Sequence, residues 1–259
     1  MLVRVESTQG SVPREAGTWM AVFAEGLVGT IGGGHLEFEA IAQARAWLQV
    51  PGQKIEKSSV KFVLGPTLGQ CCGGVVYLVF KEVTFQDATA LKQFFNNERI
   101  AKLTPVALFG GGHVGHAIVQ VLSGLPFELT WMDSRDEIFP ASVSNHVVCE
   151  HSDPVQSAVA GLKANTRVLI MSFSHAEDLE VVIACLLRQR EKADLPFMGL
   201  IGSKTKWATF RNRLAARGFT AAELAHMTCP IGVSGIKGKE PEVIAVAVAA
   251  QLLQTLHAV

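Results

Sequence analysis

Short apolar runs alternate with helical patterns along the second part of the chain. Val106–Phe109 is a run of strand formers, apolar positions at helical spacing continue from His116 to Leu122, and Phe127–Met132 predicts a second strand. Because strands that alternate with helices usually pair in parallel, residues 101–259 are expected to form a Rossmann-like, doubly wound parallel-sheet domain. The other expected elements are strands at Val147–Cys149, Arg167–Phe173 and Phe197–Ile201 and helices at Pro154–Leu162, Leu179–Gln189, after Lys204 and at Val243–Leu256.

The first part of the chain shows more alternation of apolar and polar residues and fewer helical patterns. The expected elements are strands at Leu2–Glu6, Thr18–Phe23, Leu27–Ile31, within Lys54–Leu64 and at Val75–Phe80, and helices at His35–Leu48 and Asp87–Asn96. The last helix is a linker, and we place the boundary between residues 100 and 101. Residues 1–100 are therefore expected to form a small mixed α/β domain, and the fold class of the whole chain is α/β.

A glycine motif joins the first strand and the first helix of the second domain. Gly110, Gly112 and Gly115 have the G-x-G-x-x-G spacing, and Asp133 closes the following strand. In such a motif the glycines give a tight turn, close approach of a phosphate and close helix packing. We expect an anion at the helix N-terminus, with His113 beside it, and a ribose hydroxyl donating to Asp133. The alternative is a βαβ unit with a purely structural role.

The carboxyl ends of parallel strands meet at one edge of a sheet, where ligands bind. Gly202 and Ser203 lead from a strand into the basic helix, so they predict a second anion seat to which Lys204 adds a positive charge. Lys204 is alternatively part of a solvated basic face. At the first seat, we expect Gly112→Val to fill the phosphate approach and to strain the turn.

Cys71 and Cys72 are adjacent in a glycine-rich loop over residues 65–74. A thiolate is a soft ligand and a nucleophile, so the pair is a candidate for redox chemistry or for contact with a soft metal. The alternative is two small buried apolar side chains. Gly32–Gly34 with Glu37 is a further glycine turn that enters a helix, and together with the cysteine loop it predicts another anion pocket.

Composition excludes several classes of function. Lys plus Arg and Asp plus Glu number 23 each, so no net charge attracts nucleic acid or an anionic membrane. The five cysteines follow no repeating spacing, which indicates a reducing compartment. The longest apolar stretch, Val243–Leu253, is about half as long as a membrane span. The first ten residues lack the apolar core of a signal peptide, and we expect a cytoplasmic protein.

Several stretches, in order along nearly the whole chain, match one protein family. They are GSVPREAGTWM (10–20), GTIGGGHLE (29–37), LGQCCGG (68–74), LFGGGHVGHA (108–117), MDSRDEIFP (132–140), GLIGSKTK (199–206) and PIGVSGIKGKEPEVIAVAVAAQLL (230–253). With these stretches the sequence resembles the xanthine dehydrogenase accessory proteins of the XdhC/CoxI type, and LGQCCGG is the most diagnostic. The resemblance implies an XdhC/CoxI-type domain followed by a Rossmann domain.

The resemblance also implies a molybdenum-cofactor chaperone and not an enzyme. Such a protein binds a molybdopterin-type cofactor, protects it while a cysteine desulfurase installs a terminal sulfur, and delivers it to apo xanthine dehydrogenase. Cys71 and Cys72 match the family's cysteine motif and would contact the molybdenum. Gly110–Gly115 and Gly202-Ser203 would hold the pterin phosphate or a nucleotide portion. A homodimer is the expected assembly for a protein that hands over cargo.

Two other hypotheses compete with the chaperone. One is an NAD(P)-dependent oxidoreductase that uses Cys71 and Cys72 as a redox pair and holds a dinucleotide on the Rossmann domain. The other is a structural dimer partner within a dehydrogenase complex. The chain also departs from the family, in which a short helix usually precedes the first strand and Glu is more common than Gln at position 251.

Overall fold

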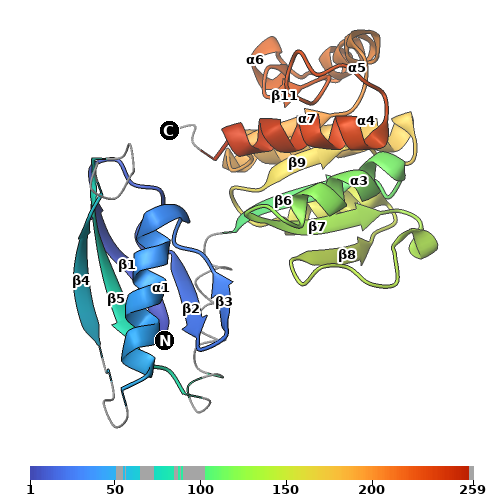
Figure 1. The fold of residues 1–259 in the computed structure, drawn as a ribbon. Helices are drawn as coiled ribbons and strands as arrows, with labels where there is room; N and C mark the ends of the chain where they lie inside the picture. Colours follow the sequence, from blue (N-terminus) through green and yellow to red (C-terminus); the bar gives the residue numbers. More distant parts are fainter. Residues whose placement is uncertain are drawn as a thin grey trace. The chain divides into compact units, whose positions relative to one another are not determined.

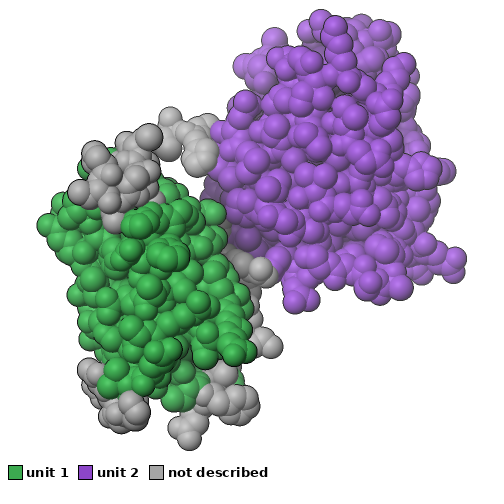
Figure 2. All heavy atoms as spheres, in the orientation of Figure 1, with its two compact units in different colours: residues 1–96 green, residues 97–259 purple. Residues whose placement is uncertain are grey.

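The chain forms two compact units, Met1–Asn96 and Asn97–Val259, shown in different colours in Figure 2. The computed structural model describes residues 1–50, 55, 57–64, 73–84, 87, 89 and 103–256. The predicted boundary between residues 100 and 101 falls outside the described residues and stays a prediction. Each unit has its own sheet and its own hydrophobic core.

The first unit is an antiparallel sheet with helix α1 (Gly34–Leu48) lying across it (Figure 1). Alternation along the strands buries Val3, Val5 and Leu78 in the same core as Leu36 of α1. The strands lie in the order β3-β2-β1-β5-β4, with bounds β1 Leu2–Gln9, β2 Trp19–Phe23, β3 Gly26–Gly29, β4 Ser58–Val63 and β5 Val75–Lys81.

Two elements of the first unit differ from expectation. Strand β1 continues to Gln9 because a bulge between Val5 and Ser7 restores its pairing with β5. Strand β3 ends at Gly29 and does not reach Ile31, because Gly29 itself has a positive φ angle of 79°. The predicted linker helix Asp87–Asn96 lies almost wholly outside the described residues.

The second unit is a parallel sheet with strand order β11-β10-β9-β6-β7-β8, and Figure 1 shows helices on its two faces. The strands are β6 Thr104–Phe109, β7 Phe127–Asp133, β8 Val147–His151, β9 Arg167–Ile170, β10 Phe197–Leu200 and β11 Met227–Thr228. The helices are α3 His113–Leu122, α4 His175–Lys192, α5 Lys204–Ala216, α6 Ala221–Leu224 and α7 Pro241–Gln254, with 3₁₀ helices η3 Asp136–Ile138 and η4 Val155–Gly161.

Strand β6 separates two core layers. Val106 and Leu108 belong to the cluster that includes α3 and α7, whereas Ala107 and Phe109 belong to the cluster that includes α4. A central strand that is buried on both faces is typical of a parallel sheet covered by helices on both sides. The predicted Rossmann-like, doubly wound architecture is therefore confirmed.

The connections of the second unit contain the main corrections. The predicted helix Pro154–Leu162 is instead the 3₁₀ helix η4, where side chains donate hydrogen bonds to backbone carbonyls. Ser157 Oγ donates to Pro154 O and Arg188 Nη1 donates to Val159 O, both at 2.8 Å. Strand β9 ends at Ile170 and not at Phe173, because the Ser172 amide turns away to Asp178 Oδ1. The short elements α6 and β11 were not predicted.

The topological switch point lies between β6 and β9. From β6 the chain builds outward to β7 and β8, and then returns to β9 and builds in the opposite direction. The loops that leave β6 and β9 therefore diverge to opposite faces of the sheet. Ligands of open α/β folds bind at such a point, beyond the carboxyl ends of the strands.

Arg188 of α4 holds the η4 segment in place. Its side chain is 7% exposed, and it pairs with Asp194 and donates to the carbonyls of Val159 and Leu162, both at 2.8 Å. We expect Arg188→Met to lower the free energy of unfolding by about 3 kcal/mol, since it leaves the half-buried carboxylate of Asp194 and the carbonyls of η4 without a donor.

Chemical denaturation of the two proteins measures this difference. Arg217→Met is the matched control, because the pair Arg217–Glu180 is 49% and 45% exposed and contributes less than about 1 kcal/mol. Equal destabilisation by the two substitutions would show that Arg188 does not hold the crossover.

Candidate functional site

The predicted site segments of the second unit gather at the carboxyl edge of the sheet. Phe109 lies opposite Met132 on one side and Ile170 on the other, and Leu200 lies opposite Ile170. The residues after these strand ends are consequently neighbours at one edge. They are the segments 110–115, 133–135, 172–175 and 202–204.

The turn after β6 depends on Gly110. Its φ angle is 127°, and a Cβ at this position would lie 2.0 Å from the carbonyl oxygen of Met171 in the loop after β9. The Gly110 amide donates to Met132 O at 2.8 Å, and the buried indole of Trp131 donates to Gly110 O at 2.9 Å. The turn therefore packs directly between the two neighbouring strand ends.

Gly111 and Gly115 are needed for close packing. A Cβ on Gly115 would lie 2.2 Å from Gly110 O, so this glycine lets α3 approach the turn. A Cβ on Gly111 would lie 2.6 Å from Ile138 Cγ1 of η3. Gly111 is not part of the predicted motif, and only its contact with η3 reveals its importance.

Gly112 is the open position of the motif. It has an ordinary φ of −74°, and a Cβ would meet nothing within 4 Å. The expectation that Gly112→Val strains the turn is therefore wrong, although the space next to the backbone is present. Gly112 precedes α3, whose N-terminus has no side-chain cap among the described residues. The amides of its first turn are free to bind an anion.

Asp133 is a structural anchor of the turn. It is buried, and its Oδ2 accepts from Gly111 N at 2.6 Å and from Arg135 Nη2 at 2.9 Å. Its Oδ1 accepts from the amide and Nε of Arg135 at 2.9 and 2.8 Å. Burial acts to raise the pKa of the Asp133 carboxyl, but the hydrogen bonds from Arg135 and Gly111 outweigh it and lower the pKa. Its role toward a ribose hydroxyl stays a prediction.

Sequence reasoning missed two bridges between the ends of β7 and β9. The Arg135 guanidinium carbon lies over the Phe173 ring, 4.5 Å from its centroid, and Ser134 Oγ donates to Glu177 Oε1 at 2.9 Å. The short spacing between Asp133 and Arg135 is a sequence signal for their pairing. No sequence signal indicated the exposure of Phe173, because the pattern placed it inside a buried strand.

The second predicted anion seat is organised by the chain's own side chains. Ser203 Oγ caps α5 and accepts from the Lys206 amide at 3.1 Å, and Lys204 is exposed at the start of the helix. A Cβ on Gly202 would lie 2.6 Å from Lys206 Cδ. The Lys206 ammonium forms a buried pair with Asp178 at 2.6 Å. Compared with α3, the start of α5 is therefore less open to an anion.

The two histidines of α3 have different environments. His113 is exposed at the first helical position, beside Gly112. His116 packs edge-on against Trp131, with the ring centroids 4.8 Å apart, and its Nδ1 lies 3.2 Å from Gly112 O. His113 is therefore placed to contact a ligand at the α3 seat, whereas His116 belongs to the packing behind it.

The glycine turn of the first unit already holds an anionic group of the chain. Glu37 Oε2 accepts from the amides of Ile31 at 2.9 Å and Gly33 at 3.1 Å, and from the hydroxyl of Thr30. Burial acts to raise the pKa of Glu37, and these hydrogen bonds lower it further than burial raises it. The expected anion pocket at this turn is thus occupied by Glu37. Cys71 and Cys72 lie outside the described residues.

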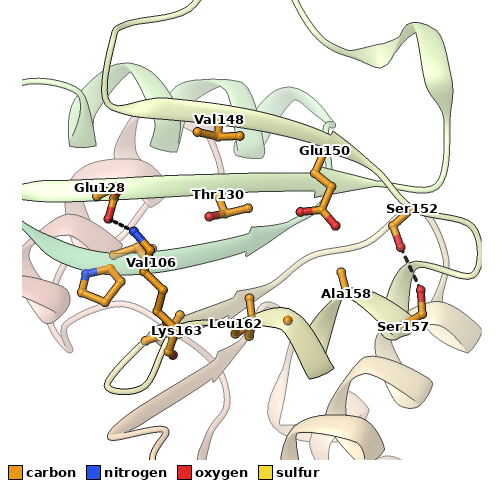
Figure 3. A pocket seen from close by; sticks show the side chains of 13 residues that line it. Val106, Glu128, Thr130, Val148, Glu150, Ser152, Ser157, Ala158, Leu162 and Lys163 are labelled. Atoms are coloured by element: carbon orange, nitrogen blue, oxygen red, sulfur yellow. Dashed lines mark hydrogen bonds and ion pairs between the residues drawn. The ribbon is translucent and has the colours of Figure 1, made fainter.

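A separate pocket of about 420 Å³ opens on a face of β6, β7 and β8 (Figure 3). Lys163 pairs with Glu128 at 2.7 Å and Ser152 pairs with Ser157 at 3.0 Å at its rim. Glu150 also lines it. None of the predicted site residues does, so this pocket is distinct from the strand-end loops.

Neither a metal-ligand cluster nor a membrane span occurs in the described part of the chain. There, no three side chains of His, Cys, Asp or Glu are grouped so that they could share one ion. Within the same residues, every helix is too short or too polar to cross a bilayer.

The glycine contacts predict destabilisation of different size at Gly110 and Gly112. Gly110→Ala is expected to lower the free energy of unfolding by about 2–4 kcal/mol, because its Cβ would overlap Met171 O and its φ is unfavourable. Gly112→Ala, where the space is open, should cost less than about 1 kcal/mol. Chemical denaturation of both variants measures the contrast, and similar losses would contradict the packing described for the turn.

Asp133 predicts a pH dependence of stability. Its folded-state pKa is lowered, so its contribution is present above the ordinary aspartate pKa of about 4 and is lost as the pH falls through the lowered value. Asp133→Asn should therefore cost about 1–3 kcal/mol at pH 7. The difference from the native protein should shrink below about pH 4. The denaturation midpoints of both proteins across this pH range test the prediction. A difference that stays constant with pH would assign the loss of stability to packing instead of charge.

Two family models match the chain. The XdhC Rossmann domain matches residues 106–252, and the XdhC and CoxI family matches residues 1–57. The uncharacterized protein YqeB of Escherichia coli (strain K12) is 25% identical over 256 residues, which is 98% of this chain and 43% of YqeB. The chain thus spans less than half the length of this curated relative.

The fold also resembles a solved structure. A xanthine dehydrogenase from Bacillus halodurans, as that structure is described, aligns with a TM-score of 0.74 and 19% identity. The alignment covers 99% of this chain and 91% of the other, so the fold is shared over both units. The Rossmann model alone covers more than half of the chain, and the second model covers its first residues in the same order. The chain belongs to the XdhC and CoxI family.

Proposed function

We propose that this protein is an accessory protein of xanthine dehydrogenase maturation that carries a molybdenum cofactor of the molybdopterin type. It holds the cofactor while a cysteine desulfurase installs a terminal sulfur and delivers it to apo xanthine dehydrogenase, without turnover of its own. The observation that carries the proposal is the ordered match of the two family models along the chain.

The start of α3 suits the anionic end of this cargo. The space beside Gly112 is open, the helix lacks a side-chain cap among the described residues, and His113 is exposed next to it. Amides at a helix N-terminus bind phosphate through hydrogen bonds and the helix dipole. The pterin phosphate would bind here, and the start of α5 at Ser203 and Lys204 is the secondary candidate.

The metal end of the cargo is assigned to Cys71 and Cys72. Molybdenum accepts sulfur donors, and thiolates are soft ligands. Leu64 and Gly74 are described on either side of residues 65–72: Leu64 N donates to Gly74 O at 2.8 Å, and a Cβ on Gly74 would lie 2.4 Å from Ser11 O. Gly74 is thus packed against the segment after β1.

The competing oxidoreductase uses the same glycine motif for NAD(P). A free acceptor at the end of β7 would be needed for the ribose, but both oxygens of Asp133 accept hydrogen bonds from Gly111 and Arg135. This arrangement favours a phosphate seat over a complete dinucleotide site. Homodimer formation and a cytoplasmic location remain part of the proposal.

Cofactor retention tests the thiol contact. After anaerobic incubation with molybdenum cofactor and desalting, we expect about one molybdenum and one pterin per chain in the native protein. Cys71→Ala or Cys72→Ala should lower retention severalfold, since a soft ligand is lost, and should leave the unfolding midpoint unchanged. Cys149→Ala is the matched control, because Cys149 is a free thiol on β8 and is not one of the predicted site residues.

Two results would contradict the proposal. Retention that is unchanged in both loop variants would remove the thiols from the mechanism. No retention by the native protein, together with saturable binding of NADH or NADPH and turnover of a carbonyl or disulfide, would establish the oxidoreductase instead. Activation of apo xanthine dehydrogenase by the loaded protein provides the second readout for delivery.

A further inference from the structure

Phe173 presents an aromatic surface at the switch point. It follows β9 in the loop that leads into α4, and it is 65% exposed although the neighbouring Met171 is buried. Single exposed apolar residues are common and need no special role. Phe173 differs because a guanidinium is held against it: Arg135 Cζ lies 4.5 Å from the centroid of its ring.

The stacked pair spans the end of β6. Arg135 follows β7 and Phe173 follows β9, and β6 lies between these two strands in the sheet. The contact therefore crosses the carboxyl end of β6, from which the glycine turn enters α3. A second contact, Ser134 Oγ to Glu177 Oε1 at 2.9 Å, joins the same two loops. Both contacts hold Phe173 in the loop after β9, the strand that lies beside β6 and its turn into α3.

The guanidinium is itself rigid. Arg135 Nε and Nη2 donate to the two oxygens of the buried Asp133 at 2.8 and 2.9 Å, which fixes the plane of the group. Asp133 is in turn bound to Gly111 of the turn. Arg135 lies over the ring of Phe173, which is 65% exposed, so the pair offers a preorganised flat surface. A ligand that stacks on it loses less conformational entropy of the protein on binding.

We propose that Phe173, supported by Arg135, is the platform on which the planar heterocycle of the ligand stacks while its phosphate binds at the start of α3. Stacking on an aromatic ring tolerates any flat π system, so the chemistry recognised is a phosphorylated planar heterocycle, either a pterin or a nucleobase. The choice of a pterin rests on the function proposed above, whereas the platform itself does not.

A ring-bearing and a ring-free probe separate stacking from phosphate binding. Binding of molybdopterin, of ADP and of inorganic pyrophosphate is measured by calorimetry with the full-length protein. Phe173→Leu keeps an apolar side chain and removes the ring, and Phe173→Tyr keeps the ring. Phe38→Leu is the matched control, because Phe38 is 66% exposed on α1 in the first unit.

The expected result is a loss of about tenfold or more in affinity for the ring-bearing probe in Phe173→Leu. Pyrophosphate binding should change less than about twofold, since phosphate contacts stay intact. Phe173→Tyr and Phe38→Leu should behave like the native protein. Loss for molybdopterin but not ADP identifies a pterin platform, and the reverse identifies a nucleobase platform.

Other outcomes overturn the platform. Equal affinity of Phe173→Leu and native protein for every ring-bearing probe, equal losses for pyrophosphate, or no ring-dependent binding at all would each exclude stacking on Phe173. These results are distinct from failure of the carrier function. Molybdenum retention that survives in Phe173→Leu would leave the carrier intact without the platform, and ring-dependent ADP binding without molybdenum retention would leave the platform without the carrier.

Discussion

The organisation of the switch point depends on one buried carboxylate. Asp133 binds the Gly111 amide of the turn before α3 and the guanidinium of Arg135, and Arg135 reaches Phe173 after β9. A charge this deeply buried is tolerated only because each oxygen accepts charge-assisted or backbone hydrogen bonds. The same group that keeps the turn in shape therefore also fixes the side chains that surround the candidate ligand seat.

The fold was largely predictable because periodicity reports burial. The strands β6 and β7, the helices α3 and α7, and the strand–glycine–helix sequence at Gly110 all have strong local patterns. The missed elements lack such patterns: β11 has two residues and α6 has four, which is too short for periodicity to decide. The carbonyls of the misassigned η4 accept from Ser157 within the segment and from Arg188, which lies outside it.

The candidate site was predictable by position but not by contact. Spacing placed the glycines, Asp133 and Ser203 at the correct edge of the sheet. It could not show that Glu37 occupies its own glycine turn, or that Gly111 rather than Gly112 is crowded. The crowding of Gly111 depends on Ile138, which is distant in sequence, whereas Glu37 is close in sequence to the turn and only the side-chain conformation shows that it binds there.

The crossover between β8 and β9 has a consequence for recombination among relatives. Its short 3₁₀ helix is held through Arg188, a side chain of the following helix α4, which replaces the backbone hydrogen bonds that a longer helix would supply. The crossover and α4 therefore depend on each other and should be exchanged together. A chimera that exchanges α4 alone would separate the guanidinium from its carbonyls. A chimera should therefore exchange the whole stretch from Val155 to Asp194.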